Sequence, residues 1–145
     1  MMELFNGGVP VVEVLERWLE EERGRGWGAM VPFIGIVRPD QGIEGLYFEL
    51  YAPLLAEWLS RWEKVEGVKI YFAHSFGKVL VGESSFVAVV FSTHREEGFH
   101  YLREFVEDFK AKAPIWKYDL KNGEKIFRKE RGKPLPGAGL LSEEE

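Results

Sequence analysis

The residues best suited to chemistry lie where a predicted helix gives way to a predicted strand. This stretch holds Lys110, Lys112 and Lys117 within eight residues, on either side of Pro114. A proline disfavours helical backbone at the residue before it, so the helix should end near Lys112 and the chain should then run extended. A lysine among other cations and apolar side chains loses proton affinity, which suits a general base or an amine nucleophile. Alternatively, these lysines only complement the helix dipole and protect a strand edge.

A second set of basic residues lies at the ends of other predicted elements. Thr93 followed by Glu96 matches a capping box, which predicts a helix that begins with His94 and Arg95. The free amides and the positive dipole end of a helix N-terminus bind anions, and an adjacent arginine suits a phosphate. Arg38, at the end of a predicted strand, adds a further cation. The alternative is that Thr93 is a simple cap and Arg95 a solvated side chain.

The remaining polar residues match no common catalytic or metal-binding pattern. His94 and His100 are six positions apart, which is not the spacing of a chelating pair on a helix. His74, in a predicted strand, is interpreted as a structural histidine. No P-loop, dinucleotide-binding fingerprint, zinc motif or Ser-His-Asp set is present in the sequence. The sequence therefore predicts no resident metal.

Composition restricts the class of protein. At 145 residues the chain is long enough for one domain with a real core, and 46% hydrophobic residues exclude general disorder. A net charge of −5 argues against a broad nucleic-acid surface. No apolar run reaches the roughly 20 residues of a membrane span, and the N-terminus lacks a signal-peptide pattern, so a cytoplasmic protein is expected. Because the chain has no cysteine, any sulfur chemistry needs sulfur from a partner.

Apolar periodicity predicts an α+β domain with a mixed or antiparallel sheet and about three helices. The predicted helices cover residues 10–23, 53–67 and 94–112, and the predicted strands cover 28–37, 43–51, 68–76, 78–81, 84–92, 115–120 and 124–127. The third helix is predicted to bury Phe99, Leu102, Phe105, Val106 and Phe109. Residues 1–128 are assigned to a single catalytic domain, and 129–145 are expected to form a flexible tail.

Four short segments form a recognisable set in this order and at these spacings. They are Gly28-Ala29 with Phe33-x-Gly35-x-Val37-Arg38, Gly77-x-x-x-x-Gly82-Glu83, Ser92-x-His94-Arg95 and Lys110-x-x-x-Pro114-x-Trp116-Lys117. Together they span most of the domain, and the last segment is the most specific. The set resembles the large, catalytic subunit of molybdopterin synthase, the MoaE family.

The resemblance implies an enzyme with the family's α/β hammerhead fold that adds two sulfurs to cyclic pyranopterin monophosphate and so forms the molybdopterin dithiolene. It implies that the sulfur comes from the thiocarboxylated Gly-Gly C-terminus of a small ubiquitin-like partner, which fits a chain without cysteine. The implied assembly is a homodimer of this chain with two small partners, a heterotetramer. No cofactor is implied, because the pterin is the substrate.

Carried over residue by residue, the resemblance implies that Lys110 and Lys117 are catalytic. The implied substrate contacts are Ile36, Val37, Arg38, His94, Arg95, Lys110, Lys117, Tyr118 and Asp119. The chain departs from the family pattern in a shorter loop after Arg38, in Ser75 where arginine is common, and in Asp119 where glutamate is usual. These departures concern loop closure and substrate contacts, and they leave the implied reaction class unchanged.

Helix geometry adds a constraint on the site. His94 and Lys110 are 16 positions apart, so a continuous helix with a rise of about 1.5 Å per residue would separate them by about 24 Å. A single pterin cannot contact both ends of such a helix. Either Gly98 breaks the helix, or the site combines His94 and Arg95 of one subunit with the lysines of another across a two-fold dimer, which is the favoured alternative.

Two functions from other classes stay open at this point. A non-catalytic phosphate- or nucleotide-binding module would use the lysines only for electrostatics. A scaffold that binds a ubiquitin-like tail would keep its partner without Lys110 and Lys117, and it would form no dithiolene product.

Overall fold

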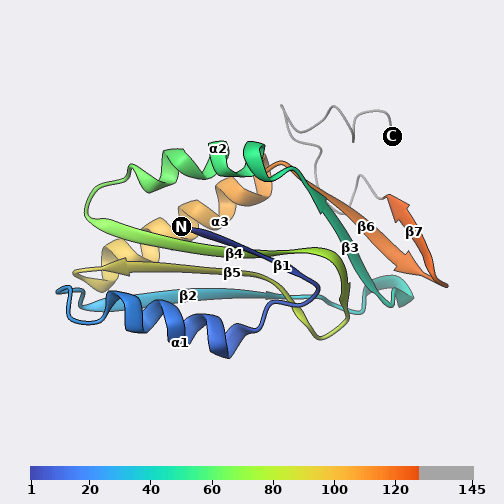
Figure 1. The fold of residues 1–145 in the computed structure, drawn as a ribbon, viewed down its shortest axis with the longest axis horizontal. Helices are drawn as coiled ribbons and strands as arrows, with labels where there is room; N and C mark the ends of the chain where they lie inside the picture. The colour runs from blue at the N-terminus through green and yellow to red at the C-terminus, as the bar shows by residue number, and fades with distance from the viewer. Residues whose placement is uncertain (128–145) are drawn as a thin grey trace.

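Three α-helices and a seven-stranded sheet make up residues 1–127, the part of the chain that the computed structural model describes (Figure 1). The helices are α1 (Val11–Glu22), α2 (Ala52–Glu63) and α3 (Arg95–Lys112), and a 3-10 turn covers Asp40–Gly42. The strands are β1 (Met2–Asn6), β2 (Ala29–Ile36), β3 (Gly45–Leu50), β4 (Val68–Leu80), β5 (Ser84–Ser92), β6 (Ile115–Lys121) and β7 (Glu124–Phe127). The predicted α+β class is confirmed, and the predicted tail, 129–145, lies outside the described residues.

The sheet is an antiparallel array with one parallel strand at its side. Its strands are ordered β2-β5-β4-β3-β6-β7, and β1 pairs in parallel with β4. The first part of β4 pairs with β5, and its last part, from Gly77 to Leu80, pairs with β3. In Figure 1, strands β3, β6 and β7 project to the right of the helix-covered strands, and these three strands are named the wing. The wing carries Lys117, whereas α3 carries Lys110.

Helices cover both faces of the central strands. On one face α1 buries Val14 and Trp18 against odd-numbered residues of β4 and β5. On the other face α2 and α3 bury Trp58 and Phe105 against even-numbered residues of the same strands. Because alternate residues of a strand point to opposite faces, β4 and β5 are apolar at nearly every central position. Figure 1 shows α1 on one side of the sheet, below it in this view, and α2 on the other side, above it.

Two strand predictions need correction. The predicted runs 68–76 and 78–81 form one strand, β4, because Gly77 continues it at a φ of +79°, where other residues are strained. A Cβ at Gly77 would also lie 2.7 Å from the side-chain oxygen of Asn6. The sequence pattern predicts no strand at the N-terminus, yet β1 forms there. Its parallel partner, β4, is distant in the chain, and such a pairing leaves no local signal.

Helix α3 begins differently from its prediction. His94 is the N-cap and makes no side-chain cap, so the predicted Thr93 capping box is wrong. Ser92 Oγ instead donates a hydrogen bond to the His94 carbonyl oxygen at 2.7 Å. From Arg95 the helix continues without a break to Lys112, which excludes a helix broken at Gly98.

The buried face of α3 also differs from its prediction at one residue. Gly98 is the position that meets the sheet, since a Cβ there would lie 2.8 Å from both Val31 Cγ2 and Ser92 Oγ. The next residue along a helix points about 100° further around the axis. Phe99, predicted to be buried, is therefore directed outward and is 59% exposed, whereas Phe105 is fully buried.

Charged residues cover the outer side of α3, the longest helix of residues 1–127, with 18 residues. Neither α3 nor another helix in this part of the chain combines the length and apolar character that crossing a lipid bilayer requires.

Candidate functional site

Lys110 and Lys117 lie on either side of a very short connection. α3 ends at Lys112, as predicted, and the buried residues Ala113 and Pro114 lead directly into β6. Lys110 is exposed in the last turn of the helix, and Lys117 is half-buried on the strand. Because only two residues separate the helix from the strand, both Lys110 and Lys117 lie near the C-terminal end of α3.

The charges of both lysines act on one buried histidine of β4. His74 is 2% exposed, and its Nδ1 lies 2.7 Å from the carbonyl oxygen of Ser75. Burial lowers the pKa of His74 to about 4; the hydrogen bond to Ser75 opposes this shift, and the positive charges of Lys117 and Lys110 add to it. The imidazole is therefore neutral at neutral pH. Both ammonium groups are close enough to this ring to repel a proton on it.

Four phenylalanine rings surround the His74 ring. Phe48 of β3 meets it edge-on, with 4.9 Å between ring centroids, and Phe109 of α3 lies at 5.4 Å. Phe86 of β5 lies at 5.9 Å and Phe72 of β4 at 6.2 Å. These five rings come from four different elements, and together they are named the aromatic floor.

Each lysine has a neighbour in this aromatic floor. Phe109 immediately precedes Lys110 in α3, and Phe48 stands opposite Lys117 in the antiparallel pairing of β3 with β6. Residues directly opposite each other in such a pair point to the same face of the sheet. The structure therefore places the charges of Lys110 and Lys117 within electrostatic reach of one buried ring. Two cations near each other can hold an anion and stabilise negative charge formed in a reaction.

Arg38 follows an end of β2 that is held firmly in place. The Val37 amide and carbonyl both bond to the turn between β4 and β5, at 2.9 Å each. The Val37 side chain is buried in a cluster with Phe48, against which Ile115 of β6 packs. Arg38 itself is exposed, with its guanidinium 2.8 Å from Asp40. Arg38 thus follows a residue that packs against the face of β6 carrying Lys117. A guanidinium at this position is suited to binding an anion.

The predicted anion-binding pair lies at the opposite end of α3. His94 is the N-cap and Arg95 the first helical residue, and both side chains are exposed. Since α3 is continuous, the 16 positions from His94 to Lys110 correspond to about 24 Å along the axis. Within one chain, the structure therefore does not bring this pair to the lysines.

The other predicted substrate contacts lie on different surfaces. Tyr118 points to the face of β6 opposite Lys117, and its hydroxyl donates a hydrogen bond to Glu49 at 2.9 Å. Asp119 shares the face of Lys117 and is only 1% exposed. Ile36 is 60% exposed at the end of β2. The sheet thus separates the side chain of Tyr118 from that of Lys117.

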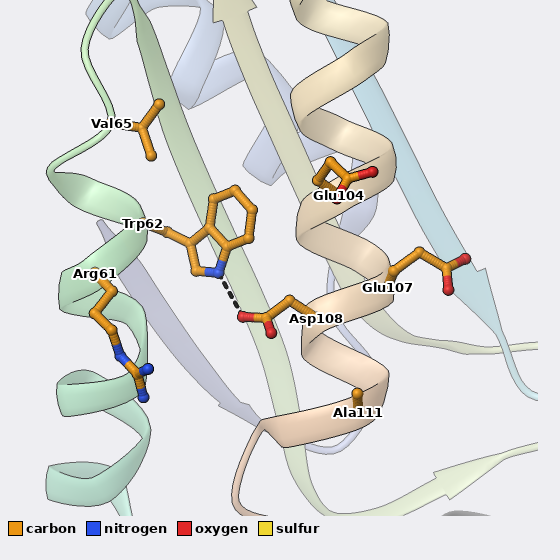
Figure 2. A pocket seen from close by; sticks show the side chains of 7 residues that line it. All are labelled: Arg61, Trp62, Val65, Glu104, Glu107, Asp108 and Ala111. Atoms are coloured by element: carbon orange, nitrogen blue, oxygen red, sulfur yellow. Dashed lines mark hydrogen bonds between the residues drawn. The ribbon is translucent and has the colours of Figure 1, made fainter.

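A groove of about 580 Å³ lies between α2 and α3, and neither Lys110 nor Lys117 lines it (Figure 2). Its lining residues are Arg61, Trp62, Val65, Glu104, Glu107, Asp108 and Ala111. Three of them are carboxylates, and none is a predicted catalytic or substrate-binding residue. Because an excess of negative charge repels a phosphate, this groove does not suit the predicted pterin.

Asp108 connects the two helices within this groove. It accepts hydrogen bonds from Trp62 Nε1 at 2.7 Å and from Trp58 Nε1 at 3.0 Å. Figure 2 shows the indole of Trp62 on α2 directed at Asp108 on α3. Lys112 lies 3.6 Å from the second carboxylate oxygen of Asp108. The carboxylate therefore holds α3 against α2 two residues before Lys110.

The described histidines and carboxylates do not gather into a metal site. Within residues 1–127, no group of three potential ligand side chains is placed to hold a metal ion. Of the three histidines, His74 is buried in β4, His94 occupies the N-cap position of α3, and His100 is exposed on that helix.

Sequence reasoning missed the position of His74. Its interpretation as a structural histidine accounts for its burial, but it does not place the ring next to Lys110 and Lys117. The only signal in the sequence is one polar residue inside an apolar run. The neighbours of His74 come from β3, β5 and α3, and no local pattern connects those segments.

The chain is similar to known proteins over nearly its whole length. A family model described as MoaE protein matches residues 11–112. The molybdopterin synthase catalytic subunit of Helicobacter pylori (strain 26695) is 41% identical over 145 residues, which cover 98% of this chain and 100% of that protein. Molybdopterin synthase catalytic subunit 1 of Mycobacterium tuberculosis is 33% identical over 101 residues, covering 64% of this chain and 69% of that protein.

Solved structures show the same arrangement of elements. The complex of subunits 1 and 2 of molybdopterin-converting factor from Helicobacter pylori 26695 matches with a TM-score of 0.89 at 41% identity, over 97% of this chain and 99% of the matched chain. Molybdopterin synthase from Staphylococcus aureus matches with a TM-score of 0.67 at 23% identity, over 87% of this chain and 95% of that one. The second likeness concerns the fold alone.

Proposed function

This chain belongs to the MoaE protein family, and from that premise we propose that it is the subunit of a molybdopterin synthase that transfers sulfur to cyclic pyranopterin monophosphate. The product is the dithiolene of molybdopterin, and the reaction needs no cofactor beyond its substrates. The observation that carries the proposal is the convergence of Lys110 and Lys117, from two elements, on the buried ring of His74. We place the reaction in the cytoplasm.

Lys110 and Lys117 perform the chemistry in this proposal. Two ammonium groups over the aromatic floor hold an anion, such as a thiocarboxylate, in place. As the thiocarboxylate sulfur bonds to a carbon of the pterin, a carbon–oxygen bond at that carbon breaks and its electron pair leaves with the oxygen. Water then cleaves the resulting thioester, so the small subunit leaves as a carboxylate and the sulfur stays on the pterin. A positioned lysine can stabilise the charge on the leaving oxygen or transfer a proton to it. The half-buried position of Lys117 supports this role, because electrostatic interactions are stronger where water is partly excluded.

The phosphate of the pterin is assigned to Arg38 together with His94 and Arg95. A guanidinium and a helix N-terminus are both suited to a phosphate. Because α3 is continuous, a single chain cannot present His94 and Lys110 to one small substrate. The proposal therefore includes a homodimer in which each site takes its His94-Arg95 pair from the neighbouring subunit. Of the other predicted contacts, Ile36 and Val37 precede Arg38 and are assigned through their backbone. The side chains of Tyr118, on the other face of β6, and of buried Asp119 are not assigned to this anion site.

The sulfur donor is assigned to a small ubiquitin-like subunit with a thiocarboxylated Gly-Gly C-terminus. The Helicobacter pylori relative was solved as a complex of two subunits, which supports a second chain here as well. This chain has no cysteine from which to supply sulfur itself. A glycine tail is thin enough to reach a half-buried lysine beside an apolar floor.

A reconstituted reaction tests this proposal. The purified chain is mixed with the thiocarboxylated small subunit and cyclic pyranopterin monophosphate, and dithiolene product is followed by mass spectrometry. Lys110→Ala and Lys117→Ala should each lower the rate by about 100-fold or more, because each removes a group that acts on the reacting atoms. Lys112→Ala is the matched control, since Lys112 lies in the same turn as Lys110 but pairs with Asp108, and it should keep most of the activity.

Three outcomes would contradict the proposal. Full activity in Lys110→Ala would remove that lysine from the mechanism. A wild-type chain that binds the small subunit but forms no product would be a scaffold. A chain that binds phosphate ligands and neither the small subunit nor a sulfur donor would be a binding module.

A further inference from the structure

His74 lies where the central sheet passes into the wing, and it contacts both lysine-bearing parts of the molecule. We propose that His74 is a positioning residue for the lysine pair: its ring sets the angle between α3 and the wing, and thereby the separation of Lys110 from Lys117. This inference rests on the proposed function, since it assumes that the two lysines act together.

The course of β4 provides the mechanical reason. Up to Phe76 this strand pairs with strands of the central sheet, and from Gly77 onward it pairs with β3 of the wing. The change occurs at Gly77, where φ is +79°. His74 lies three residues before that change of direction. Its ring contacts Phe48 on the wing side and Phe109 on the α3 side, with centroid distances of 4.9 and 5.4 Å. A rigid ring between these two neighbours sets how closely the helix and the wing approach each other.

The hydrogen bond of His74 fixes the orientation of the ring. A carbonyl oxygen can only accept, so the 2.7 Å contact with Ser75 places the proton of the neutral ring on Nδ1. A phenylalanine would fill the same space, but it would lack this bond to its own strand and would leave the Ser75 carbonyl without it. Burying an imidazole costs free energy that a purely apolar floor would avoid. The hydrogen bond to Ser75 offsets part of that cost, and it also fixes the orientation of the ring.

The neutral state of the ring also matters for the lysines. Burial and the charges of Lys117 and Lys110 hold the pKa of His74 at about 4, so the aromatic floor carries no charge at neutral pH. A protonated ring would repel both ammonium groups and push the helix and the wing apart. With a neutral ring, the aromatic floor adds no positive charge beside Lys110 and Lys117.

His74→Phe tests the proposal, because it keeps an aromatic ring and removes the bond that orients it. In the reconstituted reaction, kcat should fall about tenfold or more, while KM for the pterin should stay within about twofold, as expected for lost alignment of reacting groups. Tyr71→Phe is the matched control. Tyr71 lies on the same strand, is 1% exposed, faces α1 and donates a hydrogen bond to Glu22 at 2.5 Å. It should lose stability but keep kcat within about twofold.

A second variant guards against a general loss of folding. Phe48→Leu leaves His74 intact but shortens the wing-side contact of the ring, so kcat should fall while the melting temperature drops by no more than in Tyr71→Phe. If His74→Phe and Phe48→Leu both keep kcat within about twofold of wild type, the positioning role is overturned. The same conclusion follows if Tyr71→Phe loses as much kcat as His74→Phe.

A measurement without turnover separates this inference from the proposed function. Lysine side chains are labelled by reductive methylation with ¹³C, and the signals of Lys110 and Lys117 are assigned with Lys→Arg variants. In His74→Phe both signals should shift relative to wild type, whereas the signal of Lys69, which lies 3.8 Å from Glu22, should not. Unchanged Lys110 and Lys117 signals would overturn the positioning role. Absence of product from the wild type would instead refute the proposed function, and the lysine signals would still decide the role of His74.

Discussion

His74 and Glu22 are buried titratable side chains on opposite faces of the sheet. Glu22 accepts hydrogen bonds from Tyr71 at 2.5 Å and from Trp27 at 2.8 Å, and Lys69 lies 3.8 Å away. Burial alone would raise the pKa of Glu22, but these hydrogen bonds and the nearby positive charge hold it below its usual range. Both residues are thus kept in the form that the fold requires, His74 neutral and Glu22 ionised, and both make stability depend on pH.

Acid should destabilise the fold through His74 in a defined pH range. The folded-state pKa is about 4 and the unfolded-state pKa is about 6.5. Between these values the unfolded chain binds more protons, so the stability present above the unfolded pKa is lost as pH falls toward the folded pKa. The full loss is on the order of 3 kcal/mol. Urea unfolding measured across this range should show the decline.

Two variants separate the contribution of His74 from that of other groups. His74→Phe should flatten the decline between the two pKa values, because the titrating group is gone. Glu22→Gln should leave the upper part of this range unchanged, because the lowered pKa of Glu22 places its titration at more acidic pH. A wild-type free energy of unfolding that does not vary across the range would contradict the prediction.

Gly98→Ala should destabilise the protein even though alanine favours helices. The added Cβ would lie 2.8 Å from Val31 Cγ2 and from Ser92 Oγ, which is itself bonded to the His94 carbonyl. Overpacking of this kind costs about 1–3 kcal/mol, against a gain of about 1 kcal/mol in helix propensity. Chemical denaturation should show net destabilisation. Arg103→Ala, at an exposed position of the same helix, should change stability by less than about 0.5 kcal/mol.

At the level of elements, α3 is held at both ends by different interactions. Near its N-terminus the glycine-sized gap at residue 98 lets it approach β2 and β5 closely. Near its C-terminus Asp108 ties it to two indoles of α2, and Pro114 then stops the helix and starts β6. The position of Lys110 therefore depends on contacts made by neighbouring residues and not by Lys110 itself.

Asp108→Ala should destabilise the packing of α2 against α3. It leaves the indole N–H groups of Trp58 and Trp62 without their acceptor, and an unsatisfied donor in a partly buried position costs about 1–3 kcal/mol. Urea unfolding should show a loss on the order of 2–3 kcal/mol. Asp108→Asn keeps an oxygen acceptor and should lose less. Glu107→Ala, the exposed neighbouring carboxylate, is the control, and an equal loss in that variant would contradict the assignment.

At the level of the whole molecule, the length of α3 decides how a complete site can be assembled. The predicted phosphate-binding pair, His94 and Arg95, lies at the N-terminal end of the continuous helix α3, whereas Lys110 lies at its C-terminal end and Lys117 on the strand that follows. In the proposed symmetric dimer, the N-terminal end of α3 from one subunit meets the C-terminal end of α3 from the other, and the two sets of residues form one site.

Mixed dimers of two inactive variants should recover activity. Arg95→Ala and Lys110→Ala should each be inactive alone, but a heterodimer of the two contains one site with both residues intact. If subunits exchange at random, half of the dimers are mixed and each has one working site, so about a quarter of the wild-type rate should return. The two variants are unfolded, refolded together, and then assayed for dithiolene product. Activity no higher than the sum of the two variants would place each site within one chain.

Local signals in the sequence predicted most of the elements correctly. Pro114 ended α3, and Asn122 and Gly123, both at positive φ, formed the two-residue turn between β6 and β7. These signals act over a few residues, because proline fixes φ and the Asn-Gly pair tolerates the left-handed region. The type and order of the basic residues were equally visible, and with them the resemblance to the family.

Tertiary structure alone decided which of these residues meet. The pairing of β1 with β4, the outward direction of Phe99 and the position of His74 within reach of both lysine charges depend on contacts between distant segments. Such contacts leave no local pattern, because they are selected by how side chains fill the space between elements. The sequence therefore determined the chemistry that is available, and the packing of α3, β4 and the wing determined where Lys110 and Lys117 can apply it.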